Sequence, residues 1–192
     1  MTHRPTHCFV AAALIAALAG CAGGTSGKRY LDANMDFGAV KTVAVVPFAN
    51  LTRDNLAGDR VRDVFANGLL ATGAVYVLPL GEVARAIGRV GVVNPAAPSV
   101  EEVTKLCQQL KADAVITAVV KEYGEVRSGT ATANIVALSA QMQEALTGKV
   151  VWSGSTSKGG IGLGDRLIGG GGSPMNDVTE AAVNDLLNKL LR

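Results

Sequence analysis

The sequence predicts a mixed α/β fold, in which one mixed β-sheet is packed against helices, within a single domain of residues 40–192. In its first half, short β-branched runs alternate with segments of helical periodicity, and a strand–helix–strand order implies parallel strands joined by a crossover. In its second half, longer apolar strands follow one another through short turns, which favours antiparallel pairing. The predicted order is β-α-β-α-α-β-β-β-α.

The domain opens with a buried strand, "KTVAVVPFAN", which ends at Pro47 and Asn50. The next segment, "TRDNLAGDRVRDVFANGLLATG", predicts a helix that begins near polar Thr52 and Asp54 and ends at Gly73. Its apolar side consists of Leu56, Ala57, Val61, Val64, Phe65 and Leu69. A second strand, "AVYVLP", and a short helix, "LGEVARAIGRVG", complete this part.

A further helix is predicted in "SVEEVTKLCQQLKAD", after the proline-rich loop "NPAAPS". Ser99 can cap this helix, with Glu102 as the capping-box partner. The apolar stripe of the helix includes Cys107. We therefore expect Cys107 to be a small buried hydrophobic side chain, the usual role of a free cysteine, and not a reactive thiol.

Three strands and a helix are predicted in the second half. "ADAVITAVVKEYGEV" is a long apolar strand, and "NIVALSAQMQEAL" alternates, with one apolar face of Val136, Leu138, Ala140 and Met142. A turn at Thr147-Gly148 leads into "KVVWSGSTS". Ser173 and Pro174 open the last amphipathic helix, whose apolar side consists of Met175, Val178, Ala182, Leu186 and Leu190.

Residues 1–20 have the order of a secretory signal peptide: a short polar start, the apolar run Phe9–Leu18, and small residues before Cys21. Leu18-Ala19-Gly20-Cys21 resembles the lipobox of bacterial lipoproteins. This resemblance implies that Cys21 is the lipidated first residue of the mature chain and its membrane anchor. Ala22 in place of Asp implies the outer membrane. Residues 21–39 then form the lipidated cysteine and a flexible tether.

Cleavage at this point removes His3, His7 and Arg4, so 17 of the 18 basic residues remain against 16 acidic ones and no histidine is left. This composition excludes a His-based triad, a His-containing zinc site and a His general base. The near-zero net charge gives no electrostatic footprint for nucleic acid. Apart from the anchor only Cys107 remains, so no intramolecular disulfide can form.

Two nucleotide-binding motifs of enzymes are incomplete in the sequence. "GSTSKGG" breaks the P-loop pattern because Gly159 is followed by Gly160 where lysine is required, and "GIGLGDRL" has Leu167 where the third dinucleotide glycine should stand. Asp54, Asp59 and Asp63 could suggest an acid or metal site. Their spacing aligns them only loosely and Arg53, Arg60 and Arg62 are interleaved with them, which favours a solvated helix face.

The glycine-rich segment 159–172 is expected to be mobile and to lie at a partner surface. Four aliphatic residues, Ile161, Leu163, Leu167 and Ile168, are more than an exposed loop of a soluble protein favours. They are therefore the candidate partner-contact residues. No catalytic, cofactor-binding or metal-binding residue is expected.

Five segments carry a resemblance to the CsgG/LpoB-like superfamily of periplasm-facing lipoproteins, which includes uncharacterised neisserial-type surface lipoproteins: "VAVVPFANLT", "GAVYVLP", "GVVNPAAPS", "LKADAVITAVVKEYGEV" and "LTGKVVWSGS". The resemblance implies an anticodon-binding-like fold. It also implies an outer-membrane-anchored lipoprotein on the periplasmic side that binds an envelope protein or itself, as a scaffold or assembly factor in secretion or cell-wall synthesis, without cofactor, nucleic acid or small-molecule substrate.

Two alternatives remain beside this reading. The first is a component of a CsgG-like oligomeric channel. A membrane-spanning strand needs about 9–11 alternating residues. Only residues 130–146 and 149–157 approach that length, and the predicted sheet already uses them. The second alternative is an enzyme, which the lack of histidine in the mature chain disfavours.

Overall fold

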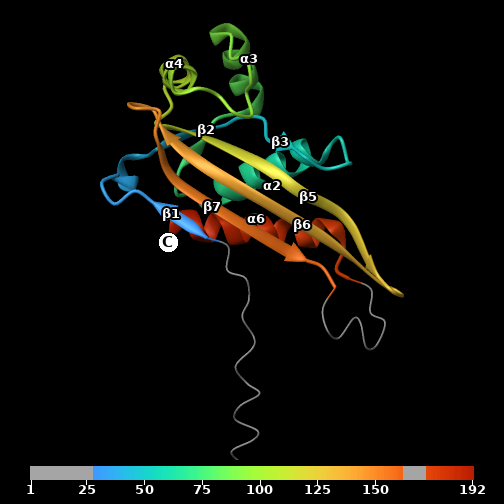
Figure 1. Cartoon of the computed structure of the whole chain (residues 1–192). Coiled ribbons are helices and arrows are strands. Elements are labelled where there is room, and N and C mark those ends of the chain that lie inside the picture. The colour runs from blue at the N-terminus through green and yellow to red at the C-terminus, as the bar shows by residue number, and fades with distance from the viewer. Residues whose placement is uncertain (1–27, 162–171) are drawn as a thin grey trace, which may run out of the picture.

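The computed structural model describes residues 28–161 and 172–192, and it confirms the predicted mixed α/β fold with one mixed sheet (Figure 1). Within these residues the predicted strands and helices occur in the predicted order. The elements are β1 (Arg29–Leu31), the 3-10 helix η1 (Phe37–Ala39), β2 (Thr42–Val45), β3 (Ala49–Asn50), α2 (Ala57–Ala71), β4 (Tyr76–Val77), α3 (Leu80–Val90), α4 (Val100–Leu110), β5 (Ala114–Ser128), β6 (Ala131–Glu144), β7 (Val150–Gly159) and α6 (Met175–Leu191).

The sheet has seven strands in the order β1-β7-β6-β5-β2-β4, and β3 pairs with β5 beside β2. Strand β2 runs parallel to β4 and β5, as the crossover through α2 requires. Strands β5, β6 and β7 are antiparallel neighbours, and β1 is antiparallel to β7. The sheet is therefore parallel at one side and antiparallel at the other, as predicted.

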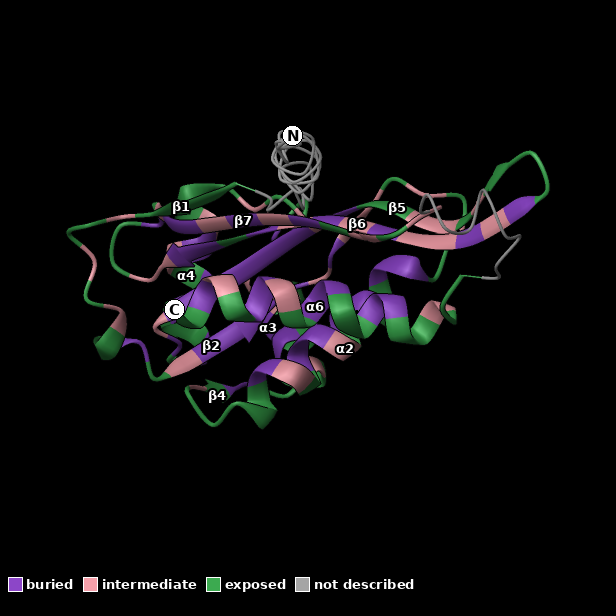
Figure 2. Cartoon of the chain, turned by 90° about the horizontal axis from the view of Figure 1, so that it is seen from below, coloured by how far each residue is buried: buried purple, intermediate pink, exposed green. Residues whose placement is uncertain are grey.

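Helices α2 and α6 cover one face of the sheet (Figure 2). The predicted stripe Val136, Leu138, Ala140 and Met142 is buried against them. Trp152 of β7 has no exposed surface, and its indole Nε1 donates a hydrogen bond of 3.1 Å to the carbonyl oxygen of Lys189 in α6. This contact joins the end of α6 to the sheet.

Helices α3 and α4 cover only one end of the opposite face, where they pack on residues such as Ala44 and Val115. The rest of this face, over β6, β7 and the remainder of β5, has none of the described helices on it, and Ser139, Ser153 and Ser155 there are half-buried. Beyond the Gly124–Ile135 pair, where β7 ends, β5 and β6 continue as a two-stranded hairpin to the turn at Gly129 (Figure 1). None of the helices in the described part of the chain is long and apolar enough to cross a membrane.

Three boundaries differ from the prediction. The expected tether, residues 21–39, contains β1, whose Tyr30 pairs with Ser153 at the sheet edge. The first strand is split into β2 and β3 because Pro47 has no N–H to donate to the ladder. Helix α2 begins at Ala57, later than Thr52 and Asp54, because those two residues are engaged in a hydrogen-bonded loop.

The predicted end signals are confirmed. Ser99 Oγ accepts a hydrogen bond from the backbone N–H of Glu102, and the Glu102 carboxylate accepts one from the backbone N–H of Ser99, which is a complete capping box. The backbone N–H groups of Ser99 and Val93, which both donate to the Glu102 carboxylate, lower the pKa of Glu102. Gly148 has φ +66°, and a Cβ there would lie 2.7 Å from Val100 Cγ1, so the turn requires glycine.

Candidate protein-binding surface

Two leucines are exposed on the loop that joins β3 to α2. Leu51 is 71% exposed and Leu56 is 54% exposed. The sequence placed Leu56 on the buried side of the helix, and this prediction is wrong because the helix begins one residue later. We call Leu51 and Leu56 the leucine pair. Burial of an exposed apolar side chain against another protein is favourable because it removes apolar surface from water.

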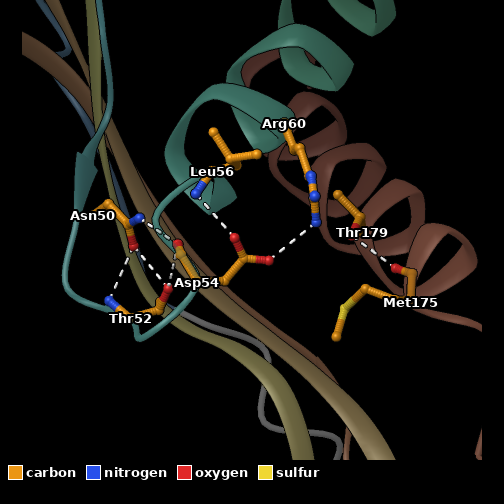
Figure 3. A network of polar contacts seen from close by, with 7 residues as sticks. All are labelled: Asn50, Thr52, Asp54, Leu56, Arg60, Met175 and Thr179. Carbon is orange, nitrogen blue, oxygen red and sulfur yellow. Dashed lines mark hydrogen bonds and ion pairs between the residues drawn. The ribbon is translucent and has the colours of Figure 1, made fainter.

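The loop under the leucine pair is held by hydrogen bonds (Figure 3). Asn50 Oδ1 accepts hydrogen bonds from Thr52 N at 3.0 Å and from Thr52 Oγ1 at 2.8 Å. Asn50 Nδ2 donates to the carbonyl oxygen of Asp54 at 2.7 Å. Asn50, Leu51 and Thr52 therefore form an Asx-type turn, whose side-chain hydrogen bonds replace those of a regular ladder.

Asp54 joins this loop to the first turn of α2. Its Oδ1 accepts from the backbone N–H of Leu56 at 2.9 Å, and its Oδ2 is 3.0 Å from Arg60 Nη1 (Figure 3). Gly58 lets the helix approach the strand, because a Cβ at that position would lie 3.1 Å from the carbonyl oxygen of Phe48. The backbone of the leucine pair is thus fixed before any partner binds, which lowers the entropic cost of binding.

A pocket of about 210 Å³ lies at the other end of α2. Its lining is mostly apolar, with one lysine at the edge: Phe37, Gly38, Val40, Lys41, Leu69, Ala74, Val75, Met142, Leu190 and Leu191. We call it the apolar pocket. Leu191, beside it, is 43% exposed. No carboxylate or thiol lines the pocket, so its composition suits an aliphatic side chain rather than a reaction.

A second groove, of about 240 Å³, lies on the part of the opposite sheet face that α3 and α4 leave uncovered. Hydroxyl and amide side chains line it together with the loop Ala96–Pro98: Thr117, Ser139, Gln141 and Gln143. Its lining contains no titratable side chain. It can therefore donate and accept hydrogen bonds but cannot exchange a proton with a substrate.

The acidic residues considered as a metal or acid site do not converge. Asp59 and Asp63 are exposed, and Asp54 is bound to Arg60 and Leu56. No cluster of three metal-ligating side chains occurs among residues 28–161 and 172–192. Arg62, predicted to lie on the solvated side, is instead buried and donates to the carbonyl oxygen of Val45, because the long side chain reaches under the helix.

Cys107 is 1% exposed, which confirms the prediction of a buried side chain. Burial, and secondly the charge of Asp113, raise the pKa of the Cys107 thiol to about 12. A thiol with such a pKa has almost no thiolate at neutral pH. Cys107 is therefore a structural side chain.

Most of the predicted partner-contact loop lies outside the described residues. Of its four aliphatic residues only Ile161 is described, and it is half-buried. Leu163, Leu167 and Ile168 are not described, and neither is the lipidation candidate Cys21. The leucine pair was missed by the sequence analysis. Its signal was the placement of two leucines in the otherwise polar stretch "NLTRDNL".

These features define a mixed α/β domain with two exposed leucines on a hydrogen-bonded loop and an apolar pocket at the other end of α2. Residues 35–190 match the model of the family described as "Putative lipoprotein GNA1162-like". The chain belongs to this GNA1162-like lipoprotein family. No curated protein matches the chain.

Solved structures share the fold. Lipoprotein GNA1162 from Neisseria meningitidis is 25% identical with a TM-score of 0.54, and the match covers 77% of this chain and 99% of that one. The PelC dodecamer from Paraburkholderia phytofirmans is 18% identical with a TM-score of 0.57, and covers 85% and 97%. The LpoB C-terminal domain from Salmonella enterica is 16% identical, covers 76% and 92%, and its TM-score of 0.46 is too low to argue from. The predicted neisserial-type relationship is thus confirmed, and the grouping with CsgG stays a prediction.

Proposed function

We propose that this protein is a lipoprotein anchored through Cys21 to the periplasmic face of the outer membrane, where it binds proteins as a scaffold or assembly factor of a cell-envelope complex. Its role is to hold proteins together, and it performs no catalysis. The partner is another envelope protein or a second copy of the chain. Family membership supports the lipid anchor, and the apolar surfaces support protein binding.

The leucine pair is the observation that carries this proposal. Leu51 and Leu56 are both more than half exposed, and the backbone between them is fixed by Asn50 and Asp54. Interface hot spots have this character: a few apolar anchors whose conformation is set in advance. A fold of this architecture is also compatible with a large assembly, since PelC is a dodecamer.

Site-specific photo-crosslinking in cells tests the proposal. A photo-reactive phenylalanine analogue is placed at Leu51 of the full-length lipoprotein, and the same analogue at Lys105, on the exposed side of α4, is the matched control. We expect a discrete crosslinked protein band from position 51 and none from position 105. The absence of any protein adduct at position 51 would contradict a protein-binding role for this surface.

A further inference from the structure

We propose that the leucine pair of one copy inserts into the apolar pocket of a second copy, so that copies associate head to tail. This inference rests on the protein-binding function proposed above and names the partner as the chain itself. It follows from the position, size and charge of the two surfaces, which are considered in turn.

The two surfaces lie at opposite ends of the same helices. The leucine pair precedes the first residue of α2, and the pocket is lined by Leu69, near the last residue of α2, and by Ala74 beyond it. A helix of 15 residues is about 22 Å long. Helix α6 (Met175–Leu191) packs beside α2, and its C-terminal end reaches the pocket as that of α2 does, since Leu69 and Leu190 both line it. The leucine pair cannot reach the pocket of its own chain.

The pocket has the size of what it is proposed to hold. An engineered cavity of about 150 Å³ lined by aliphatic and aromatic side chains stays dry and takes up benzene. A pocket of about 210 Å³ with a mostly apolar lining therefore suits one or two leucine side chains. Pockets for drug-sized ligands are larger, about 300–1,000 Å³. The volume thus favours a protein side chain over a small-molecule ligand.

The charges beside the two surfaces are complementary. Arg53 lies between Leu51 and Leu56 in the chain and is exposed, and none of the ion pairs among the described residues involves it. Asp36 is also exposed and takes part in none of these ion pairs. Its carboxylate caps the 3-10 helix η1 by accepting a hydrogen bond from the backbone N–H of Gly38, and η1 lines the pocket. Insertion of the leucine pair would bring Arg53 to the edge that carries Asp36. Lys41, at the same edge of the pocket, would then lie near Asp59 in the first turn of α2 of the inserted copy.

A head-to-tail contact uses two different surfaces of the molecule. Such heterologous contacts build a ring when the rotation closes and a filament when it does not. The smallest closed arrangement is a reciprocal dimer, in which two copies related by a rotation of 180° fill each other's pockets, and any other rotation gives a larger ring or a filament. When one copy offers only a leucine pair and the other offers only a pocket, the two can form a dimer through a single contact and nothing larger.

This property gives a complementation experiment with the purified full-length lipoprotein in detergent. The first variant, Leu51→Ser with Leu56→Ser, removes the leucine pair. The second variant, Ala74→Trp, fills the pocket from an exposed position. Matched controls change exposed residues away from both surfaces: Leu146→Ser and Ala97→Trp. Thermal unfolding by circular dichroism establishes that each variant is folded, and mass photometry gives the oligomeric state.

We expect wild-type protein and both controls to form assemblies of two or more copies, and each test variant alone to be monomeric, with its self-association weakened at least about 10-fold. An equimolar mixture of the two test variants should give dimers. Wild-type-like assembly of either variant, or a mixture that stays monomeric, would overturn the head-to-tail contact. If the wild type is monomeric while position 51 crosslinks to a different protein, this inference is wrong and the proposed protein-binding function stands.

Discussion

The guanidinium of Arg62 donates two hydrogen bonds to the carbonyl oxygen of Val45, from Nε at 3.2 Å and from Nη2 at 2.6 Å. Arg62 is only 9% exposed, and burial lowers its pKa while the nearby charge of Asp59 acts in the opposite direction. The contact fixes helix α2 to the end of β2. It therefore also fixes the helix end that carries the leucine pair.

Replacing Arg62 with methionine should destabilise the domain by about 1–3 kcal/mol, because methionine fills much of the space but donates no hydrogen bond to the Val45 carbonyl. Urea unfolding followed by circular dichroism measures this change. Arg53→Met, at an exposed position one turn before the helix, is the control and should have little effect. Equal midpoints for the two variants would show that the Arg62–Val45 contact contributes nothing to stability.

Cys107→Ala should cost on the order of 1 kcal/mol, because it leaves a small cavity among buried residues of α4. Cys107→Asp should cost several times more, because it buries a charge that has no partner and stands near Asp113. Thermal unfolding distinguishes the two. Small and equal shifts for both variants would be incompatible with the buried position of this side chain.

Asp185 should contribute stability that depends on pH. Burial raises its pKa, but hydrogen bonds from Lys189, Thr156 and Lys158 outweigh burial and lower it to about 2. An unfolded aspartate titrates near pH 3.9, so the contribution is full above about pH 4 and is lost as the pH falls toward about 2. After screening by solvent it is on the order of 1 kcal/mol.

The variant Asp185→Asn provides the measurement for this prediction. Its free energy of unfolding should be lower than that of the wild type at pH 6, and the difference should shrink between about pH 4 and pH 2. A difference that stays constant over this range would mean that the charge of Asp185 is not what stabilises the fold.

Cys21→Ser should abolish lipid attachment and leave the precursor uncleaved, because the proposed anchor forms only on the cysteine sulfur. Metabolic labelling with radioactive palmitate, followed by immunoprecipitation, measures this. Cys107→Ser is the matched control and should label like the wild type, since Cys107 is buried within the folded domain. Label on the Cys21→Ser protein would refute the anchor assignment.

The sequence predicted the elements whose signals are local. Alternation in "NIVALSAQM" placed Leu138 and Met142 in the core, and Ser99 with Glu102 marked the start of α4. The prediction failed for features that depend on a contact between residues far apart in the chain. Strand β1 has only three residues and forms because it can pair with the edge strand β7. Arg62 is buried because its guanidinium donates hydrogen bonds to the carbonyl oxygen of Val45. Neither partner is near in the sequence.

The candidate surfaces were harder to foresee for the same reason. Helical periodicity assigned Leu56 to the core, since the pattern does not show at which residue the helix begins. The network of Asn50, Thr52 and Asp54 decides that boundary. The apolar pocket joins η1, α2, β6 and α6, which are separated by up to 150 residues of sequence, so no local pattern could indicate it.

The position of β1 has a consequence for how copies meet. Only seven residues, 22–28, separate Cys21 from Arg29, where the sheet begins, and a chain of that length spans at most about 25 Å. Anchored through Cys21 as proposed, each domain would diffuse in a thin layer close to the bilayer surface. Confinement to this layer would raise the local concentration of domains far above that in the open periplasm. The proposed contact between the leucine pair and the apolar pocket, which suffices for self-association in solution, would therefore be strengthened further on the membrane.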